Sequence, residues 1–450
     1  MKTKNLFPCL AVALRRRVLF ALMAVLNLSP AGRVTAQTFT TLHSFTAGYY
    51  YDDDFWWTYT NSDGAGPKSL ILSGNTLCGT AASGGGWASG TLFAVNTDGT
   101  GFTNLHIFAP RVYNGGYVPD TNPDGISPDG LILSGNTLYG TARYGGRYGS
   151  GNLFAVNTDG TDFTNLYNFP GSGGCCPQAV PDAGLILSGN TLYGTMSSDG
   201  GAFGGAVFAI NRNGTGFTNL RSFTALNYPY VTNSDGAGTK GLILSGNTLY
   251  GTASAGGSSG NGTVFAVNTN GTAFRVLHTF SGGSNGANPS ACLILSGNIL
   301  YGTANYGGNS GVFAVNINGT GFTNLHSFAT LSGGYYGTNS DGAFLYAGLI
   351  SSGSTLYGTA AGGGTFGNGT VLSLSFAPQL TIARSGTTVI LSWPTNVAGF
   401  DYTGYVLQST TNAVSPSIWS TNSPAPVVIA GQNTVTDPVT GGQHFYRLAH

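Results

Sequence analysis

Residues 131–141 read LILSGNTLYGT, and this phrase recurs with small changes five more times along the 450-residue chain. The six copies begin at Leu70, Leu131, Leu185, Leu242, Leu293 and Leu349. Successive copies therefore start 61, 54, 57, 51 and 56 residues apart. Self-similarity at a spacing of this size is the sequence signature of a repeat architecture, in which each unit buries its apolar surface against its neighbours.

Each repeat contains four short segments with the composition of β-strands. The first ends at a Gly-Asn pair, a dipeptide that tight hairpins favour because it tolerates positive φ. The second is NTLYGTA; the third resembles TVFAVN (263–268), and an Asp-Gly or Asn-Gly turn joins it to a fourth, such as FTNLHSF (322–328). Both faces of such a sheet are apolar or small, so both need cover, as between the blades of a propeller. We therefore predict an all-β fold, a six-bladed β-propeller with four strands per blade.

The two ends of the repeat region predict how the ring closes. A fourth-strand segment, FTTLHSF (39–45), precedes the first copy of the phrase, whereas the last repeat ends at TVLSLS (370–375) with no fourth strand after it. We expect the N-terminal strand to complete the last blade, because this removes an exposed sheet edge. A solenoid would instead need capping repeats at its ends.

The composition agrees with an exported β-protein. Only 7% of residues are charged, against about 25% in an average soluble protein, and the chain contains 73 Gly and no Glu. Residues 1–36 have the features of a signal peptide: a basic start, an apolar run at 18–28, and the small-residue site Val34-Thr35-Ala36. We expect Sec-type export, a mature chain that begins at Gln37, a secreted or cell-surface location, and no transmembrane segment.

The charge of the mature chain excludes several classes of partner. The signal carries six of the 16 basic residues and no Asp, so ten basic and 16 acidic residues remain, a net charge of 10 − 16 = −6. Nucleic acids and anionic membranes need basic patches. We expect a monomer that binds neither.

The repeat also resembles a known family. The matching residues are LYGTA followed by Gly-Gly, then GTVFAVN and LHSF, across residues 39–375. They are similar to the GloVer tandem-repeat family, exported bacterial proteins with varied C-terminal sorting or anchoring modules. The resemblance implies export and a β-propeller-like repeat, and it brings no catalytic residues with it.

After Ala377 the repeat pattern stops. Residues 378–450 show alternating strands such as TTVILSWP and HFYRLAH, with Trp393 and Tyr446 as candidate core aromatics. This segment resembles a fibronectin type III or immunoglobulin-like domain. The predicted organisation is a signal peptide (1–36), a propeller (37–377) and a small C-terminal β-sandwich (378–450).

Aromatic residues gather in the crossovers between repeats and in the Gly-rich loops, where binding residues often lie. The candidate ligand-binding residues are Trp56, Trp57, Tyr59, Trp87, Tyr113, Tyr148, Tyr230 and Tyr336. Such rings suit stacking on sugar faces, and they suit a Tyr-rich protein interface equally. They can also simply pack over the blades. The expected partner is a polysaccharide or a surface protein.

Acidic residues raise two further hypotheses. Asp52, Asp53 and Asp54 form a candidate calcium site, because oxygen-rich loops bind hard cations; no other cofactor is expected. Asp-Gly recurs in the crossovers, where turn formation explains it without a metal. A glycan-active enzyme using Asp63, Asp235 or Asp341 in the propeller funnel is one alternative to a binding module, and a structural envelope or matrix component is another.

The remaining candidate residues predict no catalytic site. His43, His106, His278 and His326 share one repeat position in the fourth strand, so they should lie in separate blades and form no metal cluster. Residues 256–260 fit the GxSxG pattern but lie between two strands, whereas an esterase elbow needs a strand-to-helix turn. Cys78 replaces a repeat Tyr and should be a core residue. The adjacent Cys175 and Cys176 form either a strained disulfide or free thiols.

Overall fold

The structure is a computed structural model that describes residues 41–449. Gaps in this description fall at residues 48, 54–55, 113–119, 172–178, 182–183, 198–203, 228–230, 306–310, 333–336, 398, 403, 415–417, 422–423 and 439–441. The chain divides into two units, Met1–Ser44 and Phe45–His450. The predicted signal peptide lies outside the described residues.

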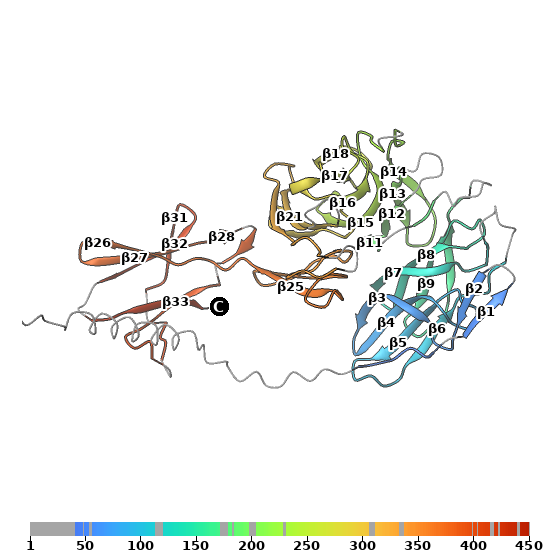
Figure 1. Cartoon of the computed structure of the whole chain (residues 1–450), viewed down its shortest axis with the longest axis horizontal. Coiled ribbons are helices and arrows are strands. Elements are labelled where there is room, and N and C mark those ends of the chain that lie inside the picture. The colour runs from blue at the N-terminus through green and yellow to red at the C-terminus, as the bar shows by residue number, and fades with distance from the viewer. Residues whose placement is uncertain are drawn as a thin grey trace, which may run out of the picture. The chain divides into compact units, whose positions relative to one another are not determined.

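The repeats fold into antiparallel sheets in which sequence neighbours pair (Figure 1). Sheet 1 contains β3 (Ala65–Ser73), β4 (Thr76–Ser83), β5 (Thr91–Asn96) and β6 (Thr103–Ile107). Sheet 2 contains β7 (Ile126–Ser134), β8 (Thr137–Tyr144), β9 (Asn152–Asn157) and β10 (Thr164–Asn168). Sheet 3 contains β11 (Ile186–Ser188), β12 (Thr191–Met196), β13 (Ala206–Asn211) and β14 (Thr218–Ser222).

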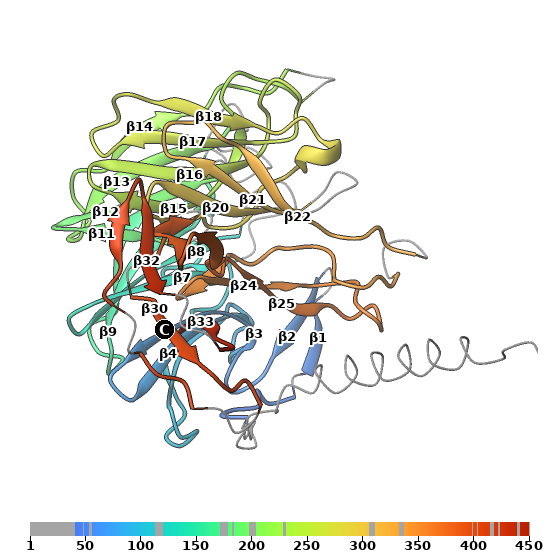
Figure 2. The same ribbon diagram turned by 90° about the vertical axis from the view of Figure 1, so that its left-hand side faces the viewer.

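The later repeats follow the same plan, and Figure 2 shows the strands of the fourth side by side. Sheet 4 contains β15 (Ala237–Ser245), β16 (Thr248–Ala255), β17 (Thr263–Asn268) and β18 (Arg275–Thr279). Sheet 5 contains β19 (Ile294–Ser296), β20 (Ile299–Ala304), β21 (Gly311–Asn316) and β22 (Thr323–Ser327). The predicted all-β repeat of four strands is confirmed for these five sheets.

The sixth sheet differs from the others. It contains β23 (Ile350–Ser352), β24 (Thr355–Ala360) and β25 (Thr370–Ser375), and no fourth strand among the described residues. Residues 41–47 of the predicted closing strand are described without regular structure. The closure of the last blade by the N-terminal strand therefore stays a prediction.

The hairpin turns sort to one end of each sheet. In sheet 1 the N–H of Thr97, in the turn between the third and fourth strands, donates to the carbonyl oxygen of Asn75, in the turn between the first and second, at 2.8 Å. Sheet 2 repeats this bond from Thr158 to Asn136 at 2.8 Å. The Gly-rich loops and the crossovers between repeats consequently share the opposite end, as the sequence predicts.

Consecutive sheets pack face to face through a repeated aromatic contact. Phe108, just after β6, is fully buried, and its ring lies 5.5 Å from that of Phe154 on β9. Phe223, after β14, makes the equivalent contact with Phe265 on β17 at 4.9 Å. Truncating one such ring in a core costs about 3–5 kcal/mol. Cys78 is also fully buried in the cluster between sheets 1 and 2, which confirms it as a core residue.

The segment after the repeats forms its own sheets. One contains β26 (Thr381–Ser385), β27 (Thr388–Pro394), β31 (Val427–Ile429) and β32 (Gln432–Pro438); β30 (Val406–Thr410) pairs with β33 (Phe445–Ala449), and β28 (Asn396–Val397) with β29 (Phe400–Asp401). Trp393 is fully buried beside Leu391, Leu407 and Val435. Tyr446 packs against this cluster and donates a hydrogen bond to Asp437. Both predicted core aromatics are thus in place.

The elements of the described chain are strands apart from one short 3₁₀ turn, Gly283–Asn285. Within the described part, no helix is long and apolar enough to cross a membrane.

Candidate functional site

The structure describes part of the predicted aromatic surface. Trp87 and Tyr148 lie in the Gly-rich loops between the second and third strands of sheets 1 and 2, and their side chains are 57% and 48% exposed. Tyr113, Tyr230 and Tyr336 lie outside the described residues.

An additional hairpin carries the first group of candidate residues. β1 (Tyr49–Asp53) pairs with β2 (Trp56–Thr60), and the register sets Asp52 opposite Trp57 and Asp53 opposite Trp56. Trp56, Trp57 and Tyr59 are thus strand residues rather than loop residues. Asp54 lies outside the described residues. The calcium site at Asp52–Asp54 stays a prediction.

Among the described Gly-rich loops, four have the same backbone and are called the tip loops here: residues 84–90, 145–151, 256–262 and 363–369. In the first, Gly90 N–H donates to Gly84 O at 3.1 Å and Ala88 N–H to Gly85 O at 3.4 Å; in the second, Gly151 donates to Gly145 at 3.0 Å. Gly84 has φ +72°, and a Cβ there would lie 2.5 Å from Oδ1 of Asn61. Only glycine satisfies both demands.

One position in each tip loop points to solvent. It is the third residue of the four-residue turn, and it holds Trp87, Tyr148, Ser259 and Phe366. The Phe366 side chain is 84% exposed, and Ser259 is exposed too. The guanidinium of Arg147 lies 5.5 Å from the centroid of the Tyr148 ring. An exposed ring at the same place in the first, second and sixth repeats has no part in core packing.

The sequence reasoning found Trp87 and Tyr148 but missed Phe366. The signal was present: each tip residue stands two positions after a Gly-Gly pair that follows the LYGT strand. Aligning the loops on that pair would have placed all four side chains at one position.

The crossovers hold the tip loops in place through an Asn-x-Asp-Gly motif, called the clamp, at residues 61–64, 122–125, 233–236 and 339–342. The Asn122 Oδ1 accepts from the N–H of Gly125 at 2.8 Å and of Gly146, in the tip loop, at 2.9 Å. Its Nδ2 donates to the carbonyl oxygen of Ala109 at 3.1 Å and of Gly125 at 2.6 Å. One buried side chain thereby joins the end of a fourth strand, the crossover and the next tip loop.

The clamp aspartates are structural. The Asp235 carboxylate accepts the Thr224 N–H at 3.1 Å and lies 2.5 Å from Nη2 of Arg221, with its side chain only 2% exposed. Asp341 accepts the Ala329 N–H at 3.1 Å, and Asp63 the Thr46 N–H at 3.0 Å. Asp235 and Asp341 thus bond to β14, β22 and the chain after these strands, and Asp63 bonds to the chain before β1.

His106, His278 and His326 lie on separate edge strands, as predicted, whereas His43 lies in residues 41–47, which have no regular structure. The Nε2 of His106 on β6 is 2.7 Å from Asp124, and that of His326 on β22 is 2.9 Å from Asp341. His278 on β18 differs: burial lowers its pKa to about 4. No group of three His, Cys, Asp or Glu that could hold a metal occurs among the described residues.

The GxSxG match at residues 256–260 belongs to a tip loop. It connects β16 with β17, two strands of sheet 4. The expectation that it lies between strands is confirmed, so no nucleophile elbow is formed there. Cys175 and Cys176 lie outside the described residues.

Among solved structures, the chain is similar to a putative 6-phosphogluconolactonase from Bacteroides fragilis at 14% identity, covering 88% of this chain and 91% of that one with a TM-score of 0.41. It is similar to an oligogalacturonate lyase in complex with manganese at 12% identity, covering 70% and 78%, TM-score 0.40. A GH74 enzyme from Niastella koreensis matches at 13% identity, covering 81% and 60%, TM-score 0.42. No curated protein matches the chain.

A comparison with protein-family models agrees with the resemblance seen in the sequence. The match covers the fourth repeat onward and extends past the last repeat sheet. Residues 227–414 fit the model of the Gloeobacter/Verrucomicrobia repeat, which identifies this part of the chain as a repeat of that type.

Proposed function

We propose that the chain is an exported or cell-surface binding module that holds a polysaccharide through the aromatic residues of its tip loops. The observation that carries this proposal is the repetition of one exposed ring, at Trp87, Tyr148 and Phe366. These rings stand on loops whose backbones are held by hydrogen bonds. A flat ring offers its face to the C–H groups of a sugar without the desolvation of a charge.

The rigidity of the tip loops supports binding rather than packing. The clamp asparagines Asn61, Asn122, Asn233 and Asn339 each hold a tip-loop glycine N–H at 2.7–2.9 Å. A loop already fixed in its bound conformation loses little conformational entropy when a ligand arrives. Equivalent weak sites on one chain suit a ligand that repeats as well, because later contacts form at a high effective concentration.

The test is binding of the purified full chain to a panel of polysaccharides, with calcium and with chelator. Trp87→Ala should weaken binding roughly 2- to 10-fold, the equivalent of about 0.5–1.5 kcal/mol for one aromatic contact. Calcium dependence would support the Asp52–Asp54 site. Absence of binding in both buffers would refute the polysaccharide proposal in favour of a protein partner.

The fourth repeat provides a matched control, because its tip loop has the same backbone and carries serine. Ser259→Trp should strengthen binding, and Ser259→Ala should leave it unchanged. Neither variant nor Trp87→Ala should shift the unfolding free energy by more than about 0.5 kcal/mol, as usual for exposed side chains. Loss of binding on Ser259→Trp would contradict the assignment of the tip position.

A further inference from the structure

The second tip loop and the strand end before it contain a duplicated Arg-Tyr pair, since residues 143–148 read RYGGRY. The Arg143 guanidinium lies 5.8 Å from the centroid of the Tyr144 ring, and that of Arg147 lies 5.5 Å from the centroid of the Tyr148 ring. Both tyrosine side chains are exposed. An exposed ring with a cation beside it is therefore present twice at this end of sheet 2.

A third arginine lies beside the first tip loop. Nη2 of Arg111, an exposed residue of the crossover after β6, donates to the carbonyl oxygen of Ala88 at 3.4 Å. The residue before Ala88 is Trp87, whose side chain is exposed. The first tip loop thus combines an aromatic ring with a guanidinium, as the second does.

The two tip loops stand on neighbouring sheets that are in contact at this end. The N–H of Ser127 on β7 donates to the carbonyl oxygen of Ser89, in the first tip loop, at 2.9 Å. The crossover that carries Arg111 continues to the clamp Asn122, whose Oδ1 accepts the N–H of Gly146, in the second tip loop, at 2.9 Å. One crossover therefore contacts both loops, and the three arginines share one end of sheets 1 and 2.

Positive charge is concentrated at this end. In the tip loops, the strand ends before them and the crossovers, the sequence has three basic residues, namely Arg111, Arg143 and Arg147. The crossover between sheets 1 and 2 contains two acidic residues, Asp120 and Asp124, and the Asp124 carboxylate is largely buried with Nε2 of His106 at 2.7 Å. The local balance of charge is therefore positive, although acidic residues outnumber basic ones in the predicted mature chain.

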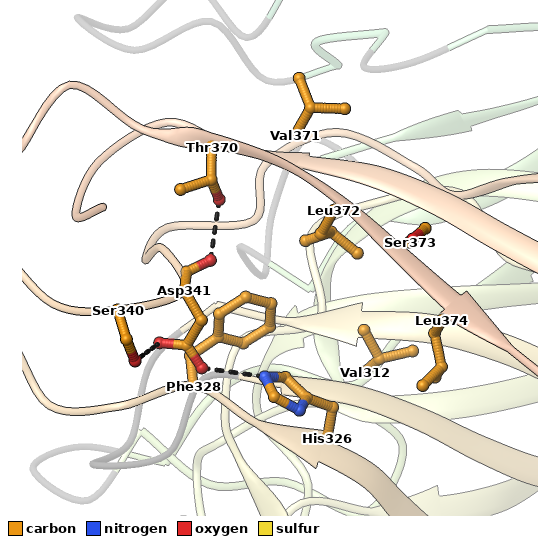
Figure 3. A pocket seen from close by; sticks show the side chains of 10 residues that line it. All are labelled: Val312, His326, Phe328, Ser340, Asp341, Thr370, Val371, Leu372, Ser373 and Leu374. Atoms are coloured by element: carbon orange, nitrogen blue, oxygen red, sulfur yellow. Dashed lines mark hydrogen bonds and ion pairs between the residues drawn. The ribbon is translucent and has the colours of Figure 1, made fainter. Parts of the chain in front are cut away.

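The sixth repeat has an exposed ring without an arginine. Residues 328–369, which include Phe366, contain Asp341 and neither Lys nor Arg. Figure 3 shows the Asp341 carboxylate beside a cavity of about 300 Å³, with Nε2 of His326 at 2.9 Å. An anionic ligand is therefore attracted to the first two tip loops and finds no matching cation at the sixth.

An arginine beside an exposed ring suits an acidic sugar. A guanidinium donates two parallel N–H bonds to the oxygens of a carboxylate or a similar oxyanion, and the ring stacks on the C–H groups of the sugar. The N–H of Arg147 donates to Oδ1 of Asn168 at 2.9 Å, so the arginine stands on a fixed backbone. A uronate or a sulfated sugar presents an apolar face and an anionic group within one residue of the polymer.

We propose that the polysaccharide is acidic, and that its carboxylate or sulfate groups bind Arg111 and Arg147 while its sugar rings stack on Trp87 and Tyr148. Arg143 adds positive charge beside the second tip loop. This inference rests on the binding function proposed above and names the class of its ligand.

The test is binding of the full chain to polygalacturonate, dextran sulfate and neutral dextran, with a chelator present so that calcium does not cross-link the acidic polymers. The first two polymers distinguish carboxylate from sulfate. We expect one acidic polymer to bind roughly tenfold more tightly than dextran at low salt, and this advantage to shrink as NaCl rises from about 50 mM to about 500 mM, because salt screens exposed charges.

The arginines are tested one at a time. Arg147→Gln should weaken binding of the acidic polymer roughly 2- to 5-fold, as usual for an exposed charge pair, and leave dextran binding unchanged. Arg147→Lys keeps the charge and should retain part of the affinity. The matched control is Arg212→Gln, because this exposed arginine lies 6.0 Å from the Tyr139 ring but belongs to a hairpin turn at the opposite end of the sheets. It should leave binding of all three polymers unchanged.

The outcomes separate this inference from the function on which it rests. If neutral polysaccharides bind as tightly as the acidic polymers, the ligand class is wrong and the binding function stands; if no polysaccharide binds, both are wrong. Equal weakening by Arg147→Gln and Arg212→Gln would show that the overall charge of the chain, rather than this end of sheets 1 and 2, holds the polymer. Single-stranded DNA that binds as tightly as the acidic polymer would overturn the assignment to a sugar.

Discussion

Two junctions between sheets have a histidine at the same position of the fourth strand and differ in the hydrogen-bond acceptor of that histidine. Between sheets 1 and 2, the clamp Asp124 receives the Ala109 N–H at 3.0 Å and holds His106 at 2.7 Å. Between sheets 4 and 5, the crossover has no Asp-Gly, and Nε2 of His278 is buried without a hydrogen-bond partner among the described residues. That crossover is held by backbone bonds, such as Asn288 N–H to Asn261 O at 2.8 Å.

The junction between sheets 4 and 5 forms without a clamp, so the clamp stabilises a junction that other contacts already make. Both junctions keep the stacked ring, with His106 on Phe163 and His278 on Phe322. Apolar packing and ring stacking therefore form the junction. The clamp carboxylate gives the imidazole of His106 a hydrogen-bond partner that the imidazole of His278 lacks within the described part of the chain. Buried groups without a partner resist ionisation, and burial accordingly lowers the pKa of His278 to about 4.

The largest effect is expected from removing the asparagine of a clamp. Asn122→Ala leaves the N–H groups of Gly125 and Gly146 and the carbonyl oxygen of Ala109 without their partner. Each unsatisfied buried group costs about 1–3 kcal/mol, so we expect a loss of about 3–5 kcal/mol in urea unfolding. Asn285→Ala, in the junction without a clamp, removes one bond to Ser281 and should cost less than about 1 kcal/mol. Equal costs would mean that the clamp does not stabilise the junction.

A smaller effect is expected from neutralising a clamp carboxylate. Asp235→Asn removes the counter-charge of Arg221 while it keeps the side-chain shape. We expect a loss of about 2–3 kcal/mol, measured in the same way, because the remaining charge is partly buried. The matched control is Asp98→Asn in an exposed turn, where Asn213 of another repeat already accepts the Thr215 N–H at 3.1 Å as Asp98 accepts that of Thr100. A cost below that of the control would contradict a structural role for Asp235.

The smallest effect concerns pH. The pKa of His278 is about 4 in the folded chain and near 6.5 when unfolded, so the unfolded state binds the proton first. The stability contributed by this neutral imidazole is complete above about pH 6.5 and is lost as the pH falls toward 4. His278→Tyr, which copies Tyr167 of the second repeat, should reduce the fall in melting temperature between pH 7.5 and 4.5. An unchanged fall would assign the acid sensitivity to other groups.

The strands were predictable from the sequence because their signals are local. Alternating apolar residues and Gly-Asn or Asp-Gly turns occur within a few residues of each strand, as around Leu131 and Asn136, and Cys78 stood out by replacing a repeat tyrosine. The candidate site was harder to predict from the sequence. The clamp bonds span larger separations, 24 residues from Asn122 to Gly146, and an Asp-Gly pair looks the same whether its carboxylate forms a turn or binds a distant strand.

The tip position accepts different side chains without a change of the loop fold. Because Trp87, Tyr148, Ser259 and Phe366 occupy the same turn, the backbone there accepts large, small, polar and apolar side chains alike. On the binding function proposed above, mutations at these four codons change the ligand preference while the clamp asparagine keeps the loop in its conformation. The same proposal implies that the ligand preference can change one repeat at a time, and that these four positions suit a library of designed binders.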